Sequence, residues 1–142
     1  MITVAVSGGF DPLHIGHVKL IREAKALGNR LIVILNNDNW LKKKKGYVFM
    51  NESERAAILR AVRDVNEVII TSHPENSEDM SVCRELEKLK PDIFANGGDR
   101  KADNIPEYDL CSRLGIKMVF KVGGEKAQSS SELVRKARES GN

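Results

Sequence analysis

The amino-acid sequence predicts an α/β protein built on one doubly wound sheet of five parallel strands. Short apolar segments alternate with amphipathic segments along the 142 residues, and strands that alternate with helices form parallel sheets with right-handed crossovers. Glycine-rich and polar segments follow the predicted strands, at the sheet edge where such folds bind ligands. Because no repeat, low-complexity linker or break in composition interrupts this order, we expect one Rossmann-like domain over residues 1–142.

The first half of the chain begins with a predicted strand over residues 2–6. Apolar positions at helical spacing predict a helix over residues 16–27, with Gly28-Asn29 as its C-terminal cap. The continuous apolar run over residues 30–35 is typical of a strand buried on both faces. Residues 36–50 are polar and rich in lysine, and we expect them to form a loop.

The second half of the chain continues the same alternation. Asn51 is expected to cap a helix that runs to about residue 62, with Glu54 at the position of a capping box. The remaining predicted strands cover residues 67–71, 92–95 and 117–122, and the remaining predicted helices cover 79–89, 106–114 and 129–140. Pro91 and Gly115 are expected to end the helices that precede them.

Composition restricts the classes of partner. Hydrophobic residues make up 41% and charged residues 30% of the chain, and a net charge of +3 is too small to indicate nucleic acid binding. The apolar run over residues 31–35 is far too short to cross a bilayer, and no signal-peptide pattern is found. Cys83 and Cys111 lack the spacing of a metal or disulfide framework. We expect a cytoplasmic protein with reduced structural thiols and no nucleic-acid or membrane partner.

Residues 7–17 carry the features that indicate chemistry. Gly8 and Gly9 allow close approach of a ligand to the backbone, and the helix N-terminus beyond them is suited to phosphate. His14 and His17 lie at that same end, where imidazole donors can stabilise charge that builds on phosphoryl oxygens. A metal pair is disfavoured because His73 is the only other histidine. The Walker loop and the GxGxxG fingerprint are both absent.

The segment His14-Ile15-Gly16-His17, preceded by Gly9-Phe10-Asp11, resembles the HxGH signature of the nucleotidyltransferase superfamily. The superfamily includes glycerol-3-phosphate and choline-phosphate cytidylyltransferases and heptose-1-phosphate and pantetheine-phosphate adenylyltransferases. The resemblance implies transfer of a nucleoside monophosphate from a triphosphate to a phosphorylated small molecule, with release of pyrophosphate. Phe94 to Arg100 and the lysine-rich segment are most similar to heptose-phosphate adenylyltransferases.

The resemblance also implies a role for each matching residue. The catalytic set comprises His14, His17, Lys42, Lys45 and Arg55. The nucleotide-binding set comprises Gly8, Gly9, Phe10, Asp11, Gly16, Gly97, Gly98, Asp99, Ser129, Ser130 and Ser131, and the acceptor set comprises Asp38, Trp40 and Arg100. The cofactor is Mg²⁺ held by the triphosphate, with no direct protein site for the metal. A homodimer is expected, because small members of the superfamily are usually dimers or larger.

For several of these residues the sequence also allows a purely structural role in place of ligand binding. Asp11 could orient the Mg²⁺–triphosphate complex or a neighbouring group, or it could cap a helix. The run Lys42 to Lys45 could bind phosphate through Lys42 or Lys45, or form a solvated loop face. Arg55 could bind an anion, or pair at the surface with Glu52 or Glu54. Ser129 to Ser131 could bind phosphate or only cap a helix, and Trp40 could line the acceptor pocket or pack over the sheet edge.

The nucleotide is expected to be ATP or CTP. Many cytidylyltransferases carry an Arg-Thr-x-Gly-Ile-Ser-Thr segment before the last helix, whereas residues 123–131 lack that arginine. Gly97-Gly98-Asp99 favours ATP by resemblance. A nucleotide-binding sensor without turnover is the alternative function, although both histidines favour an enzyme. An aminoacyl-tRNA synthetase is excluded by the short chain and by the absence of a Lys-Met-Ser-Lys-Ser loop.

Overall fold

The computed structural model describes residues 1–98, 105–124 and 130–140. Five parallel strands form one sheet in the order β3-β2-β1-β4-β5, which confirms the predicted doubly wound fold. The strands are β1 (Thr3–Gly8), β2 (Arg30–Leu35), β3 (Glu67–Ile70), β4 (Ile93–Ala95) and β5 (Lys117–Val119). The order reverses between β1 and β4, so the carboxyl ends of these two strands form the switch point where ligands bind in such sheets.

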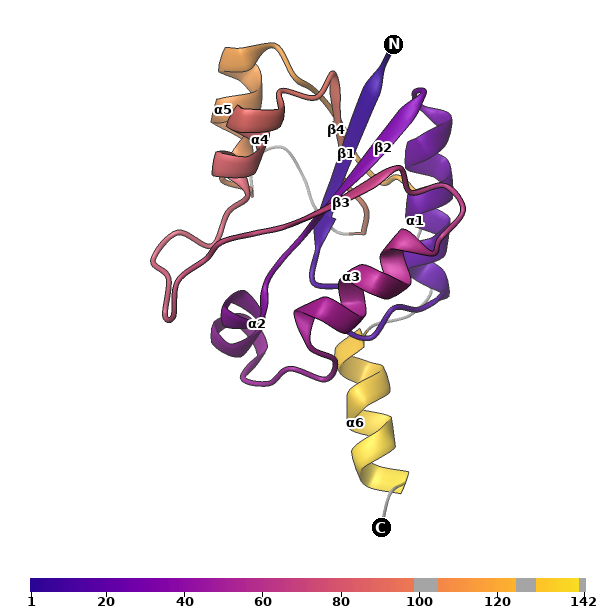
Figure 1. The fold of residues 1–142 in the computed structure, drawn as a ribbon, viewed down its shortest axis with the longest axis vertical. Coiled ribbons are helices and arrows are strands. Elements are labelled where there is room, and N and C mark those ends of the chain that lie inside the picture. The colour runs from indigo at the N-terminus through magenta and orange to yellow at the C-terminus, as the bar shows by residue number, and fades with distance from the viewer. Residues whose placement is uncertain (99–104, 125–129, 141–142) are drawn as a thin grey trace.

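Helices cover both faces of the sheet (Figure 1). They are α1 (Ile15–Ala26), α2 (Asp38–Lys45), α3 (Glu52–Arg60), α4 (Cys83–Leu89), α5 (Glu107–Leu114) and α6 (Ser130–Ser140). The helices α1 and α3 pack on one face through one hydrophobic cluster, and α4 and α5 pack on the other face through a second cluster. Successive side chains of β1 point to opposite faces of the sheet, so Val4 and Val6 join the first cluster and Ala5 joins the second.

The segment 36–50 differs from the prediction, because its first part is helical. The Asn37 side chain accepts a hydrogen bond from the Trp40 N–H and begins α2, and Gly46, with a left-handed φ of 83°, ends it. Apolar spacing gave no signal for this helix because Leu41 is its one buried residue. The four lysines therefore lie on a helix rather than in a loop.

Three other predicted boundaries also change. The helix predicted over residues 79–89 begins only at Cys83, because the Asp79 carboxylate accepts hydrogen bonds from the Ser81 N–H and hydroxyl and holds a turn before it. The strand predicted over residues 117–122 ends at Val119. Leu27 rather than Gly28 caps α1. A Cβ at Gly28 would lie 2.7 Å from the Ile2 carbonyl oxygen, so close packing against the start of β1 requires this glycine.

Within residues 1–98, 105–124 and 130–140, no helix is long and apolar enough to cross a membrane. The helix α6 extends away from the sheet at the bottom of Figure 1. It is attached at its N-terminal end, where Ser130 and Val134 are buried.

Candidate active site

A cavity of about 980 Å³ opens at the carboxyl ends of β1 and β4. The residues from the predicted site that line it are Gly8, His14, Gly16, His17, Trp40, Lys45, Gly97, Gly98, Ser130 and Ser131. The structure thus brings together four segments that lie far apart in the sequence, at the switch point of the sheet. The predicted residues Gly9, Phe10, Asp11, Asp38, Lys42 and Arg55 do not line the cavity.

His14 and His17 form a capping box at the N-terminus of α1. Nδ1 of His14 accepts a hydrogen bond from the Gly16 N–H at 3.0 Å, and Nδ1 of His17 accepts one from the His14 N–H at 3.2 Å. A ring nitrogen that accepts carries no proton, so each neutral imidazole has its proton on Nε2. The backbone therefore fixes the tautomer of both histidines and makes each Nε2 a donor.

Packing also fixes the orientation of the two rings. The His14 and His17 rings stack with centroids 3.9 Å apart, and the Phe10 ring meets the His17 ring edge-on at 4.8 Å. Phe10 has a left-handed φ of 49°, is 4% exposed, and lies 3.2 Å from where a Cβ on Gly8 would be. Phe10 was predicted to bind nucleotide; the structure places it beneath the histidines, where it supports His17.

Asp11 holds a neighbouring segment of the chain. Its carboxylate is 1% exposed and accepts hydrogen bonds from the Phe49 N–H at 2.6 Å and the Met50 N–H at 2.7 Å. The alternative that Asp11 caps a helix is wrong, because His14 is the N-cap of α1. Asp11 fixes the segment before α3 relative to the loop that carries the histidines.

Arg55 is buried, and its guanidinium donates to four protein acceptors. It bonds to the carbonyl oxygens of Gly9, Asn36 and Met50 at 2.8, 2.6 and 2.9 Å, and to the Asp38 carboxylate at 2.6 Å. The alternative of a surface pair with Glu52 or Glu54 is wrong, because the Arg55 side chain is 0% exposed and pairs with Asp38. This geometry supports a positioning role for both Arg55 and Asp38.

The lysines of α2 point in different directions because successive residues of a helix are about 100° apart. Lys44 and Lys45 line the cavity, Lys43 donates to the Ser77 carbonyl oxygen, and Lys42 is exposed outside the cavity. Of the two predicted phosphate-binding lysines, the structure places Lys45 at the site and Lys42 away from it. The position of Lys44 at the cavity was not predicted.

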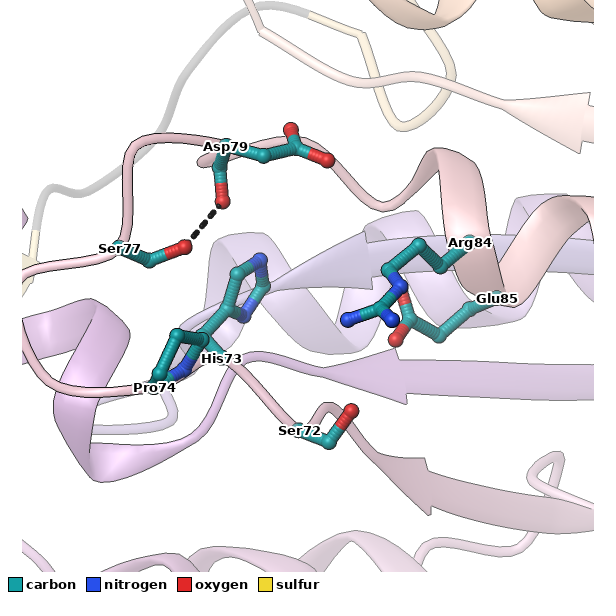
Figure 2. Close-up of a pocket in the computed structure, with 7 residues that line it drawn as sticks. All are labelled: Ser72, His73, Pro74, Ser77, Asp79, Arg84 and Glu85. Carbon is teal, nitrogen blue, oxygen red and sulfur yellow. Dashed lines mark hydrogen bonds between the residues drawn. The ribbon is translucent and has the colours of Figure 1, made fainter.

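The segment over residues 72–82 forms part of the cavity wall and, with Arg84 and Glu85 of α4, lines a second hollow of about 260 Å³, shown in Figure 2. His73 lines this hollow, with Nδ1 2.7 Å from the Thr71 hydroxyl and Nε2 2.9 Å from the Ser81 carbonyl oxygen. Both ring nitrogens are thus used within the protein, and His73 holds the segment in place. The hydrogen bonds from Ser81 keep the pKa of Asp79 below its usual value.

Trp40 connects this segment to α2, since its Nε1–H donates to the Met80 carbonyl oxygen at 2.8 Å. Trp40, Lys44 and Lys45 with residues 78–81 are called the α2 wall below; all of them line the cavity. The alternative that Trp40 lines the pocket is the one that the structure supports.

The other side of the cavity is built from glycines and the start of α6. A Cβ on Gly97 would lie 3.1 Å from the Val122 carbonyl oxygen, and Gly98 has a left-handed φ of 62°. The Ser130 hydroxyl donates to the Pro12 carbonyl oxygen at 2.9 Å, which joins α6 to the histidine loop. Asp99, Arg100 and Ser129, which were also predicted for the site, lie outside the described residues.

Sequence reasoning missed Glu107, which lines the cavity although it is only 1% exposed. Its Oε1 accepts a hydrogen bond from the Val82 N–H at 3.1 Å. Glu107 Oε2 and Asn36 Oδ1 are the buried side-chain polar atoms of the described chain that have no partner. No local pattern marks Glu107, because its partner Val82 is 25 residues away in the sequence.

The family model described as cytidylyltransferase-like matches residues 5–137. The chain belongs to this family. The chain is 40% identical over 118 residues to the FAD synthase of Pyrococcus abyssi, a match that covers 82% of this chain and 76% of that protein. It is 30% identical to the bifunctional protein HldE of Aliarcobacter butzleri over 98% of this chain and 28% of that protein.

Two solved structures share the fold of this chain. A lipopolysaccharide core biosynthesis protein from Thermoplasma volcanium matches with a TM-score of 0.66 and 26% identity over 91% of this chain and 98% of that one. The pantothenate synthetase of Thermus thermophilus, at 12% identity and a TM-score of 0.63, shares the fold alone. The chain is therefore a nucleotidyltransferase by family, as its HxGH segment predicts.

Proposed function

We propose that this nucleotidyltransferase transfers AMP from ATP to the phosphate of a sugar or polyol phosphate and releases pyrophosphate. The observation that carries the proposal is the stacked pair of His14 and His17, whose Nδ1 atoms are both engaged by backbone N–H groups at the start of α1. Two oriented Nε2–H donors beside a helix N-terminus suit the phosphates of a nucleotide.

The proposed reaction needs alignment more than acid–base chemistry. An oxygen of the acceptor phosphate attacks the α-phosphorus in line, a new P–O bond forms, and the bond to the oxygen that bridges to the β-phosphate breaks. Pyrophosphate leaves with that electron pair. The attacking phosphate is already ionised near neutral pH, so no strong general base is required, and positioning and charge stabilisation supply the catalysis.

The protein groups divide this work between two sides of the cavity. His14 and His17 would donate to the oxygens of the reacting phosphates, while Lys44 and Lys45 on the α2 wall would hold phosphate as point charges. Within the part of the chain that the structure describes, no group of three metal-ligating side chains could hold an ion. We propose that Mg²⁺ enters with the triphosphate, whose oxygens are its ligands and whose charge it would partly neutralise.

The preference for ATP is supported by the relatives. FAD contains AMP joined to FMN through a pyrophosphate bond, and the FAD synthase of Pyrococcus abyssi is 40% identical to this chain. FMN carries its phosphate on a ribityl chain, so it belongs to the same polyol-phosphate class as the sugar phosphates that the sequence resemblance implies. A single domain over residues 1–142, a homodimer and a cytoplasmic location stay predictions from the sequence.

The test is pyrophosphate release from each of ATP, CTP, GTP and UTP with Mg²⁺ against FMN, a heptose 1-phosphate and glycerol 3-phosphate. We expect turnover that requires both a triphosphate and an acceptor, and that is fastest with ATP. The double variant His14→Ala/His17→Ala is the matched control and should release almost none. Selectivity for CTP would overturn the adenine assignment alone, whereas nucleotide binding without release from any pair would favour a sensor over an enzyme.

A further inference from the structure

Glu107 is a buried carboxylate whose two oxygens have different surroundings. It is the first residue of α5, and only 1% of it is exposed. Oε1 accepts the Val82 N–H at 3.1 Å, whereas Oε2 has no hydrogen-bond partner among the described residues. A buried carboxylate oxygen without a partner is unfavourable, because it has lost its hydration and received nothing in exchange. Such an atom beside a cavity indicates a ligand group that completes it.

The contacts of Glu107 place it next to the α2 wall. The bond to Val82 fixes Glu107 beside residues 78–81, and the bond from Trp40 to Met80 fixes those residues to α2. All of these segments line the same cavity. The histidines lie on a different element, at the start of α1. Glu107 therefore belongs to the side of the cavity that carries Lys44 and Lys45.

The chemistry of Oε2 restricts what it can meet. A carboxylate oxygen accepts hydrogen bonds or ligates a cation, and no group of three metal-ligating side chains lies among the described residues. We therefore expect its partner to present an O–H or N–H group. The phosphates of both substrates are anionic acceptors and do not fit. Sugar and polyol phosphates carry hydroxyl groups close to their phosphate, and the lysines of the α2 wall would hold that phosphate nearby.

We propose that Glu107 determines acceptor specificity, its Oε2 accepting a hydrogen bond from a hydroxyl group of a sugar or polyol phosphate bound against the α2 wall. This inference rests on the proposed function and names the acceptor group that is recognised. A site built to receive a hydroxyl discriminates strongly against an analogue that lacks it, because the buried carboxylate is then left unpaired.

The test uses Glu107→Gln in the full chain. The amide oxygen of Gln can still accept from Val82, while its NH₂ group replaces Oε2 and reverses the polarity of the bond. Glu87→Gln is the matched control, because Glu87 is exposed on α4 and does not line the cavity, and the change removes the same charge. The probes are MgATP with FMN, a heptose 1-phosphate, glycerol 3-phosphate and 3-hydroxypropyl phosphate, which lacks the central hydroxyl of glycerol.

We expect Glu107→Gln to lower kcat/KM for the best acceptor by about 10- to 100-fold, mainly through KM, the usual worth of a hydrogen bond to a charged group. Its ATP affinity by calorimetry and its melting temperature should match the wild type, and Glu87→Gln should leave acceptor kinetics unchanged. Unchanged acceptor kinetics in Glu107→Gln, an equal loss in Glu87→Gln, or a loss of ATP affinity in place of acceptor affinity would each overturn the assignment.

Calorimetry with the acceptors alone separates this inference from the proposed function. Binding of a polyol phosphate that Glu107→Gln weakens, without pyrophosphate release by the wild type, would refute the transfer reaction and still support Glu107. Turnover by the wild type that Glu107→Gln leaves intact would do the reverse. Neither binding nor turnover with any acceptor would overturn both.

Discussion

Replacement of Arg55 should destabilise the protein more than it slows the reaction of the folded enzyme. The guanidinium is fully buried and donates to three backbone carbonyl oxygens and to the Asp38 carboxylate. These acceptors belong to the histidine loop, the residue after β2, the start of α2 and the segment before α3. Arg55→Ala leaves all of them without their donor, so the loss falls on the contacts that hold the site together.

The structure sets the size of the effect. Breaking a buried ion pair costs about 3–5 kcal/mol of unfolding free energy. The Asp38 side chain is 27% exposed and can regain water, so we expect Arg55→Ala to fall near the lower end, at about 3 kcal/mol. Arg55→Met combined with Asp38→Asn should recover part of the loss, because no uncompensated carboxylate remains. Urea unfolding measures each difference in unfolding free energy, provided that the variants show the same dependence of this free energy on urea concentration.

Arg55→Lys distinguishes positioning from catalysis. A lysine keeps the charge but cannot span the same four acceptors, so a positioning role predicts lower stability and near-normal turnover where the variant is folded. The opposite result, native stability with turnover reduced by about 10²-fold or more, would refute the positioning role and restore the predicted contact with the reacting phosphates.

The remaining predictions concern the two sides of the cavity and the core. His14→Ala and His17→Ala should each lower turnover by about 10²- to 10⁴-fold, the usual loss on removing a transition-state donor, as measured by pyrophosphate release. Lys45→Ala should weaken phosphate binding in calorimetry, more so at low salt, while Lys42→Ala should not. Burial and the nearby Glu107 raise the pKa of the Cys111 thiol to about 11, so alkylation followed by mass spectrometry should be slow at pH 8.

Each of these outcomes has a contrary result. Near-normal rates in both histidine variants would remove the pair from the mechanism. Equal effects of the two lysine variants would mean that the position of Lys45 at the cavity does not matter for phosphate binding.

The neutral Cys111 thiol contributes fully to stability below pH 9.0, the ordinary pKa of a thiol, and this contribution is lost as the pH rises toward 11. Labelling of native Cys111 at pH 8 as fast as in urea would contradict its burial.

The sequence was sufficient for the sheet and for the histidines because both depend on local patterns. Apolar runs mark β1 and β2, and the HxGH segment follows β1 directly, so its position at the carboxyl edge could be inferred. The helix α2 was missed because its caps, Asn37 and Gly46, enclose four lysines with little apolar periodicity.

The roles of buried polar residues could not be read in the same way. Arg55 and Asp11 were expected to touch ligand, yet their partners lie 5 to 46 residues away along the chain and are mostly backbone groups. The Glu107 carboxylate accepts a hydrogen bond from the N–H of Val82, which lies at the start of a different helix, α4. Almost every residue type has the same backbone N–H and C=O groups, so the sequence does not show which backbone group a buried side chain will meet. These contacts can be identified only from the tertiary structure.

The stacking of His14 on His17 couples the two rings to each other and to the start of α1. With ring centroids 3.9 Å apart, two imidazolium cations would repel each other by about 4 kcal/mol at an effective dielectric constant of 20. Each added proton would also occupy an Nδ1 that now accepts a backbone N–H, and would open the first turn of α1. Loss of either backbone hydrogen bond would therefore disturb both the orientation of the two rings and the start of α1.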